Sequence, residues 1–180
     1  MNPKFKDFFR DQSFQAVVFL GGSGDGKRIK NLAYKHVLPS KEWLPLPPEL
    51  LPDCKEPIPL FWMDFEILLD VGIKEFYFTI PPKFKDEIFK YFQVKNKGNF
   101  EIEIIDTKKE GKKGKDEANK IKIYLVPSKR EGTAKALLAL ENFLHSPFIV
   151  IFGDEFYGWD REELVKEFKR FIKEGAEEIQ

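Results

Sequence analysis

A glycine-rich loop follows the first apolar run of the chain. Residues 16–20 are five consecutive apolar residues, which predict a buried strand, and the loop after them holds four glycines and then Lys27 and Arg28. Glycine permits positive φ and lets backbone N–H groups converge on an anion, while a strand ending there brings those donors to the carboxyl end of a sheet. The segment therefore predicts a phosphate site with two cations as counter-charges.

The spacing of the glycines separates the interpretations of this loop. A dinucleotide fingerprint needs G-x-G-x-x-G, and glycines at positions 22, 24 and 26 do not fit it. A P-loop fits better, because Gly21, Gly26 and Lys27 match G-x-x-x-x-G-K. Arg28, however, stands where a Ser or Thr hydroxyl holds Mg²⁺ in that motif. A P-loop-like NTPase and an ordinary tight turn both stay open as alternatives.

An acid follows the most apolar run in the second half of the chain. Residues 148–152 (FIVIF) predict a parallel strand that is covered on both faces, and Asp154 comes two positions later. Open α/β sheets bind ligands at the carboxyl ends of their strands, so we expect this acid to lie across from the glycine loop. The alternative is that Asp154 is a loop acid or an N-cap acid ahead of the last helix.

Apolar periodicity predicts the elements that position these residues. Strands are expected where apolar residues form short runs or alternate, at 15–20, 74–80, 100–105, 121–126 and 148–152. Helices are expected at 58–71, 83–92, 134–144 and 160–174, with Gly72 ending the first and Asp160 with Glu163 capping the last. This alternation of strands and helices predicts a Rossmann-like three-layer α/β/α sandwich with a mostly parallel sheet.

Two connections are unusually long. Residues 45–59 hold six prolines, so they cannot continue a helix or a central strand, and they form either a stiff surface excursion or a functional or interfacial loop. Residues 106–120 mix six lysines with four acids between two strands of period two. The simplest interpretation of this second segment is a solvated hairpin tip.

Composition excludes several classes of protein. Thirty basic and thirty acidic side chains give a net charge of zero, which argues against nucleic-acid or membrane-surface binding through bulk electrostatics. The single cysteine, Cys54, excludes an intramolecular disulfide framework and fits a reducing cytoplasm. We find no apolar run of membrane-spanning length and no signal-peptide core, so a cytoplasmic protein is expected. Abundant Lys and Glu lean toward a thermophilic source.

Five segments occur in an order that resembles one enzyme family. They are LGGSGDGKRI, YKHVLP, KEPIPLFWMDFEILLDVGIKEFYF, REGTAKAL and FIVIFGDE. Together they resemble the sugar-phosphate nucleotidyltransferases, which include glucose-1-phosphate thymidylyl- and uridylyltransferases. The likeness runs from about residue 15 to the end of the chain, and it implies the fold of the nucleotide-diphospho-sugar transferases.

The resemblance also implies roles for particular residues. Arg28 and Lys35 correspond to cations that face the phosphates during catalysis, and Asp154 corresponds to the aspartate that holds Mg²⁺. Lys27 is also expected to bind the nucleotide, because its place in the loop makes it a counter-charge for a phosphate. The other residues expected to bind the nucleotide match the family's glycine loop and its segment beside the nucleobase: Gly21, Gly22, Ser23, Gly24, Gly132 and Thr133.

The activity implied is a Mg²⁺-dependent transfer of a nucleoside monophosphate from a nucleoside triphosphate to a sugar 1-phosphate or related phosphate. No side-chain nucleophile is required, in agreement with the lack of a convincing Ser-His or Cys-His pairing. Asp25, Gly26 and Lys27 stand where the family has one threonine, and this longer loop favours an alternative. In the alternative, the chain is a catalytically degenerate nucleotide-binding or subunit-interaction protein of the same fold.

The resemblance also predicts the domain organisation. Residues 1–14 are expected to be an N-terminal extension, and 15–180 a single domain without the family's second half, which binds the sugar and supplies a second metal-binding acid. A partner chain or a homo-oligomer would then complete the site. Phe5, Phe8 and Phe9 have helical spacing, which predicts that the extension packs onto the domain or onto a second subunit.

Overall fold

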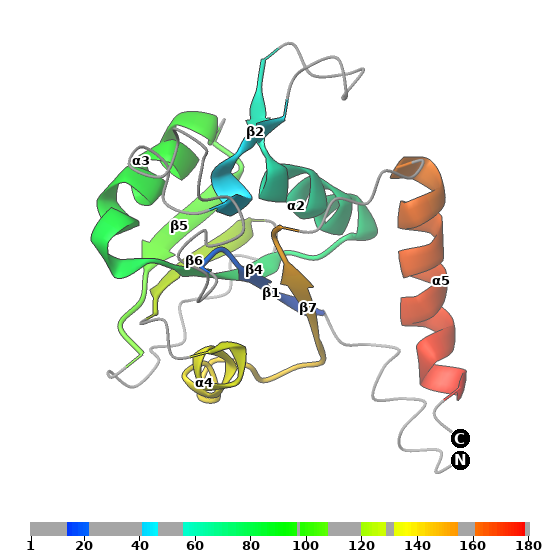
Figure 1. Cartoon of the computed structure of the whole chain (residues 1–180). Helices are drawn as coiled ribbons and strands as arrows, with labels where there is room; N and C mark the ends of the chain where they lie inside the picture. Colours follow the sequence, from blue (N-terminus) through cyan, green and yellow to red (C-terminus); the bar gives the residue numbers. More distant parts are fainter. Residues whose placement is uncertain are drawn as a thin grey trace.

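The computed structural model describes residues 14–21, 41–46, 56–96, 98–107, 120–128, 132–154 and 161–178, and thirteen helices and strands lie in these ranges (Figure 1). The strands are β1 (Gln15–Phe19), β2 (Pro45–Leu46), β3 (Ile58–Pro59), β4 (Glu75–Ile80), β5 (Phe100–Ile104), β6 (Ile121–Pro127) and β7 (Phe148–Phe152). The helices are η3 (Lys41–Trp43), α2 (Leu60–Val71), η5 (Pro82–Phe84), α3 (Lys85–Lys95), α4 (Thr133–Leu138) and α5 (Arg161–Glu178).

The main sheet is parallel throughout, with strand order β5-β6-β4-β1-β7. Phe19, the last residue of β1, lies opposite Thr79 of β4 on one side and opposite Phe152 of β7 on the other. From β1 the chain crosses to β4 and later returns to the far side of β1 for β7. The carboxyl end of the sheet between β1 and β7 is therefore a topological switch point, the place where open α/β sheets bind ligands.

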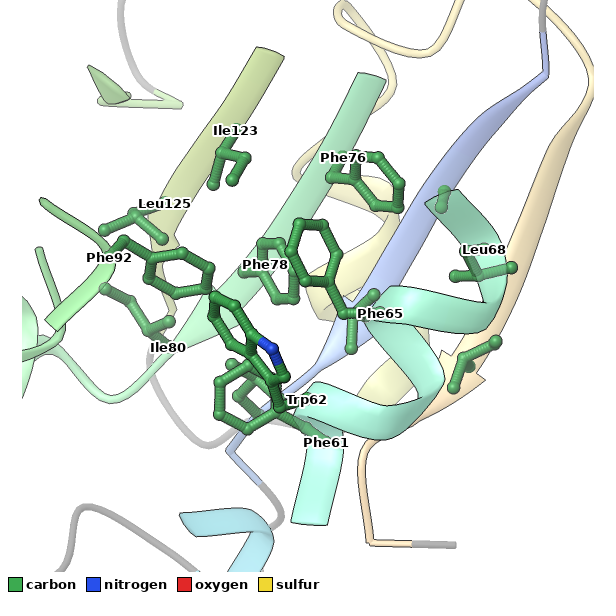
Figure 2. Packing of buried hydrophobic residues seen from close by; sticks show 14 of the residues in the cluster. Phe61, Trp62, Phe65, Leu68, Phe76, Phe78, Ile80, Phe92, Ile123 and Leu125 are labelled. Carbon is green, nitrogen blue, oxygen red and sulfur yellow. The ribbon is translucent and has the colours of Figure 1, made fainter. Parts of the chain in front are cut away.

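Helices cover both faces of this sheet, so the chain has the expected three-layer α/β/α architecture. On one face, rings from α2 and α3 pack against the strands, and Phe61, Phe65 and Phe92 are fully buried there (Figure 2). The Phe65 ring lies 4.8 Å from the Phe76 ring of β4. On the other face, α4 and the turn after it bury a smaller cluster that is built from Val17, Phe19, Tyr77, Ile105, Val126, Ala136 and Leu140.

The helix after the proline-rich segment ends as its sequence predicts. Gly72 has φ 105°, a left-handed conformation that favours glycine, and its N–H donates to the Leu69 carbonyl at 2.9 Å. The Ile73 N–H donates to the Leu68 carbonyl at 3.1 Å, which completes a Schellman motif. The chain is thereby turned directly from α2 into β4, the strand beside β1.

The structure corrects two expectations about the strands. β5 and β6 pair in parallel, so the segment 106–120 is a crossover connection and the predicted hairpin is wrong. β7 is the strand predicted to be covered on both faces, but it is an edge strand, and Phe148, Val150 and Phe152 are 40%, 38% and 40% exposed. Its apolar run predicted the strand correctly without indicating which neighbours cover it.

The helix expected at 134–144 is also shorter than its pattern indicated, since α4 ends at Leu138 and turns follow. The proline-rich segment starts and finishes in a small antiparallel ladder, in which Pro45 lies opposite Pro59 and Leu46 opposite Ile58. Residues 47–55 and the predicted cap at Asp160 lie outside the described residues. None of the described helices is both long and apolar enough to cross a membrane.

Candidate functional site

The candidate site lies at the carboxyl end of the sheet, where the chain leaves β1 and β7. Beyond the last residue of β1, the Leu20 N–H donates to the Thr79 carbonyl at 3.0 Å. Beyond β7, the Gly153 N–H donates to the Phe19 carbonyl at 3.2 Å. These bonds extend the strand pairing by one residue on each side of β1. They hold Gly21, the first glycine of the loop, and Asp154 at the same end of neighbouring strands.

Gly153 permits this close approach because it has no side chain. A Cβ atom at this position would lie 2.7 Å from Leu20 Cδ2 and 2.9 Å from Phe61 Cβ, both closer than real contacts allow. The turn after β7 therefore packs directly on the end of β1 and on α2. Asp154, the next residue, is placed by this packed backbone rather than by an open loop.

Asp154 forms an ion pair that no pattern in the sequence predicts. Its Oδ2 accepts a hydrogen bond from the ammonium of Lys41, a residue 113 positions away in the chain. The side chains are 27% and 40% exposed respectively, so both partners are reachable from solvent. An ion pair this exposed contributes little to stability, typically about 0–1 kcal/mol. The pair is therefore of interest because it places two opposite charges at the candidate site.

Lys41 is held in place by the buried residues that follow it. Trp43 is 7% exposed, and its ring lies 4.8 Å from the Phe61 ring of α2 and 5.1 Å from the Tyr91 ring of α3. The Leu60 N–H donates to the Leu44 carbonyl at 3.0 Å, which ties the segment to the start of α2. The 3₁₀ turn η3 is thus anchored on the aromatic core, and it presents Lys41 toward Asp154.

A buried acid lies next to Lys41 in the same turn. Glu42 is 1% exposed, and no hydrogen-bond donor among the described residues reaches its Oε2. Asp154 and Glu42 belong to no group of three or more potential metal ligands within the described ranges. Mg²⁺ is commonly held in proteins by one or two carboxylates together with substrate phosphates and water. The partly exposed carboxylate of Asp154 fits that requirement.

Gly132 and Thr133 lie at the same end of the sheet, after β6. Gly132 has φ 98°, which favours glycine, and it precedes the first residue of α4. Both residues are exposed. With β4 between β6 and β1, and neighbouring strands about 4.8 Å apart, the end of β6 is roughly 10 Å across the sheet from the end of β1.

The remaining predicted site residues lie outside the described residues. These are Gly22, Ser23, Gly24, Lys27, Arg28 and Lys35. The structure therefore brings Gly21, Gly132, Thr133 and Asp154 to one end of the sheet and adds Lys41 to them. A lysine ahead of a proline-rich segment carries no distinguishing pattern, which is why sequence reasoning missed it.

Comparisons with known proteins find similarity at the level of solved structures. No protein-family model and no curated protein matches this sequence. The crystal structure of Rv0371c from Mycobacterium tuberculosis H37Rv is similar with a TM-score of 0.45 and 12% sequence identity, over 92% of this chain and 62% of that chain. This chain thus spans less than two thirds of the length of that protein.

Proposed function

We propose that this chain is a sugar-phosphate nucleotidyltransferase that transfers a nucleoside monophosphate from a nucleoside triphosphate to a sugar 1-phosphate or related phosphate. The observation that carries the proposal is the position of Asp154. This carboxylate is partly exposed at the carboxyl end of β7, beside the start of the glycine loop on β1. Ligands of open α/β sheets bind at such a switch point.

In this reaction an oxygen of the sugar phosphate attacks the α-phosphorus in line. The bond from the α-phosphorus to the bridging oxygen breaks, and pyrophosphate leaves with that oxygen. The chemistry needs cations and N–H donors where negative charge builds up, and it needs no nucleophilic side chain. When bound, Mg²⁺ supplies charge neutralisation on the phosphate oxygens.

The residues of this chain divide that work. The loop that begins at Gly21 offers backbone N–H groups to the phosphates. Arg28 and Lys35, which resemble the phosphate-facing cations of the family, supply positive charge. Asp154 is the residue that would hold Mg²⁺. Lys41 neutralises Asp154 in the absence of a ligand, and its partly exposed ammonium lies within reach of a phosphate bound beside that carboxylate.

Product analysis tests this proposal. The purified chain is incubated with Mg²⁺, the four common nucleoside triphosphates with dTTP, and a mixture of sugar 1-phosphates, and the products are identified by mass spectrometry. A nucleotide-sugar with pyrophosphate is expected, and Asp154→Asn should abolish it. Asp86→Asn, at an exposed acid in the first turn of α3, is the matched control and should leave the products unchanged.

The ion pair between Asp154 and Lys41 also favours a second candidate, a nucleotide-binding or subunit-interaction protein of this fold without catalytic activity. Asp154 is already neutralised by Lys41, and within the described ranges it belongs to no larger cluster of metal ligands. Nucleotide binding without turnover would support this candidate. Orthophosphate with a nucleoside diphosphate would instead support a P-loop-like NTPase, and either result would overturn the transferase.

A further inference from the structure

Asp154, the residue that would hold Mg²⁺, already has a positive charge beside it. Its Oδ2 accepts a hydrogen bond from the ammonium of Lys41, which within the described ranges is the one donor to this carboxylate. A divalent cation binds a carboxylate through the same oxygen lone pairs that accept hydrogen bonds. A metal ion can therefore take that oxygen only after the ammonium has left it.

The ammonium of Lys41 is the partner that can move. The backbone of Asp154 follows Gly153, which is packed on the end of β1 and on α2. Lys41 is held by its main chain, since its carbonyl accepts from the Leu44 N–H at 3.0 Å. Its side chain, 40% exposed, carries the charge at the end of a flexible four-carbon stem. The pair can therefore open by rotation within this side chain, without any change in the fold.

The carboxylate of Asp154 is better covered than those of the other ion pairs that join separate segments of the described structure. The Lys95 ammonium lies 3.6 Å from Glu56, whose side chain is 79% exposed. The Lys120 ammonium lies 3.7 Å from Glu101, whose side chain is 51% exposed. The corresponding value for Asp154 is 27%. Charges interact more strongly where less water surrounds them, so the lysine at the candidate site is an effective competitor for a metal ion.

A bound phosphate changes this competition. An ammonium is a compact point charge that binds phosphate oxygens well. A triphosphate beside Asp154 supplies oxygens to which the Lys41 ammonium can transfer, so that neither charge loses a partner when the carboxylate turns to a metal ion. A free metal ion brings no such acceptor, and two positive charges would then meet at one carboxylate.

We propose that Lys41 makes this site selective for metal–triphosphate complexes over free divalent cations. In the free protein its ammonium occupies the cation position on Asp154, and transfer of the ammonium to a phosphate oxygen opens that position. Binding of the metal ion and binding of the triphosphate are thus coupled through one side chain. The transfer to phosphate rests on the proposed function, whereas the exclusion of free cations rests on the ion pair alone.

Binding of Mn²⁺ alone tests the exclusion of free cations. Electron paramagnetic resonance counts the unbound Mn²⁺, so the measurement needs neither nucleotide nor turnover. Lys41→Met should bind Mn²⁺ about fivefold more tightly than the wild-type chain, which is the largest factor expected from breaking an exposed ion pair. Lys41→Arg keeps the positive charge and should keep the weaker binding. Lys120→Met, which breaks an exposed ion pair ahead of β6, is the matched control and should leave the affinity unchanged.

A double variant assigns the gained affinity to the candidate site. Lys41→Met combined with Asp154→Asn should lose the gain, because the carboxylate that the ammonium covered is then absent. Equal Mn²⁺ affinities in the wild-type chain and in Lys41→Met would overturn the proposal. A gain that persists in the double variant would also overturn it, since the cation would then bind elsewhere.

Inorganic tripolyphosphate with Mg²⁺ tests the transfer to phosphate, because it presents a triphosphate without a base. In titration calorimetry Lys41→Met should weaken its binding about fivefold, the opposite direction to the change for Mn²⁺. Binding that Lys41→Met leaves unchanged or strengthens would overturn the transfer. If tripolyphosphate binds to neither protein, the proposed function fails, whereas tighter Mn²⁺ binding in Lys41→Met would still support the exclusion of free cations.

Discussion

At the amino end of the parallel sheet polar side chains bind one another, whereas at the carboxyl end they lie partly open to solvent. Gln15, 1% exposed, donates from Nε2 to Glu75 Oε1 at 2.8 Å, and its Oε1 accepts from the His145 N–H at 3.1 Å and the Ser146 N–H at 3.2 Å. The Tyr77 hydroxyl donates to the same carboxylate. At the carboxyl end, Asp154 and Lys41 form an exposed pair.

The contrast separates a structural network from a candidate binding site. Burial in the amino-end network raises the pKa of the Tyr77 hydroxyl, and its hydrogen bond to Glu75 raises it further. The hydrogen bonds of Gln15 and Tyr77 attach the turn after α4 to β1 and β4. The charged groups of the carboxyl end are exchangeable, because solvent or a ligand can replace either partner. We therefore expect amino-end substitutions to change stability and carboxyl-end substitutions to change binding.

The largest effect on stability is expected at Gln15. Gln15→Leu removes the acceptor for the His145 and Ser146 N–H groups and the donor to Glu75, which should lower the free energy of unfolding by about 3 kcal/mol. Chemical denaturation measures this loss. Gln93→Leu, at an exposed glutamine of α3, is the control and should cost little. A loss at Gln15 no larger than at Gln93 would remove the structural role of the network.

Gly153 should be the most sensitive position for stability at the carboxyl end. The added methyl of Gly153→Ala meets Leu20 and Phe61 at under 3 Å, so we expect a loss of about 2 kcal/mol from overpacking. Gly21→Ala is the matched control, because its Cβ would contact Pro81 at an ordinary 3.5 Å. Equal melting temperatures for the two variants would show that the turn after β7 is loosely packed.

Alkaline pH should weaken the amino end through Tyr77. Its folded-state pKa is raised, so the folded protein retains a proton that the unfolded chain loses above about pH 10. Stability is therefore fully present below pH 10 and falls above it by up to about 1.4 kcal/mol per pH unit. Tyr77→Phe should make that fall shallower between pH 9 and 11, as followed by urea denaturation. Identical slopes in the two proteins would rule out Tyr77 as the titrating group.

The smallest effect on stability is expected at Lys41. Lys41→Met breaks an exposed ion pair, so the free energy of unfolding should change by no more than about 0.5 kcal/mol. The variant should nevertheless alter nucleotide binding, measured by titration calorimetry, since it removes a cation from beside Asp154. A loss of stability above 2 kcal/mol would place Lys41 in the structural network and weaken the distinction between the two ends of the sheet.

Much of the fold follows from the sequence because it depends on local patterns. Apolar runs and alternation located the five strands of the main sheet, Gly72 marked the end of α2, and the strand–helix order predicted a parallel sheet. The pairing of β5 with β6 did not follow, because alternation predicts a strand and leaves the direction of its neighbour open. The exposure of β7 depends on its place at the edge, which an apolar run does not encode.

The candidate site was predictable to a smaller extent. The rule that ligands bind at the carboxyl ends of strands placed Asp154 near the loop of Gly21, and the structure has both at that end. Lys41 was missed because its partner is 113 residues away, and contact across that separation depends on the aromatic anchoring of Trp43. The roles of Arg28 and Lys35 stay predictions.

A nucleotide site at the carboxyl end of the sheet is tested by equilibrium binding of nucleoside triphosphates with and without Mg²⁺, compared between the wild-type chain and Asp154→Asn. We predict that binding requires Mg²⁺ and weakens at least about tenfold, or 1.4 kcal/mol, in the variant, while the melting temperature stays the same. Equal affinities in the two proteins, or no binding of any nucleoside triphosphate to the wild-type chain, would contradict a nucleotide site at the carboxyl end of the sheet.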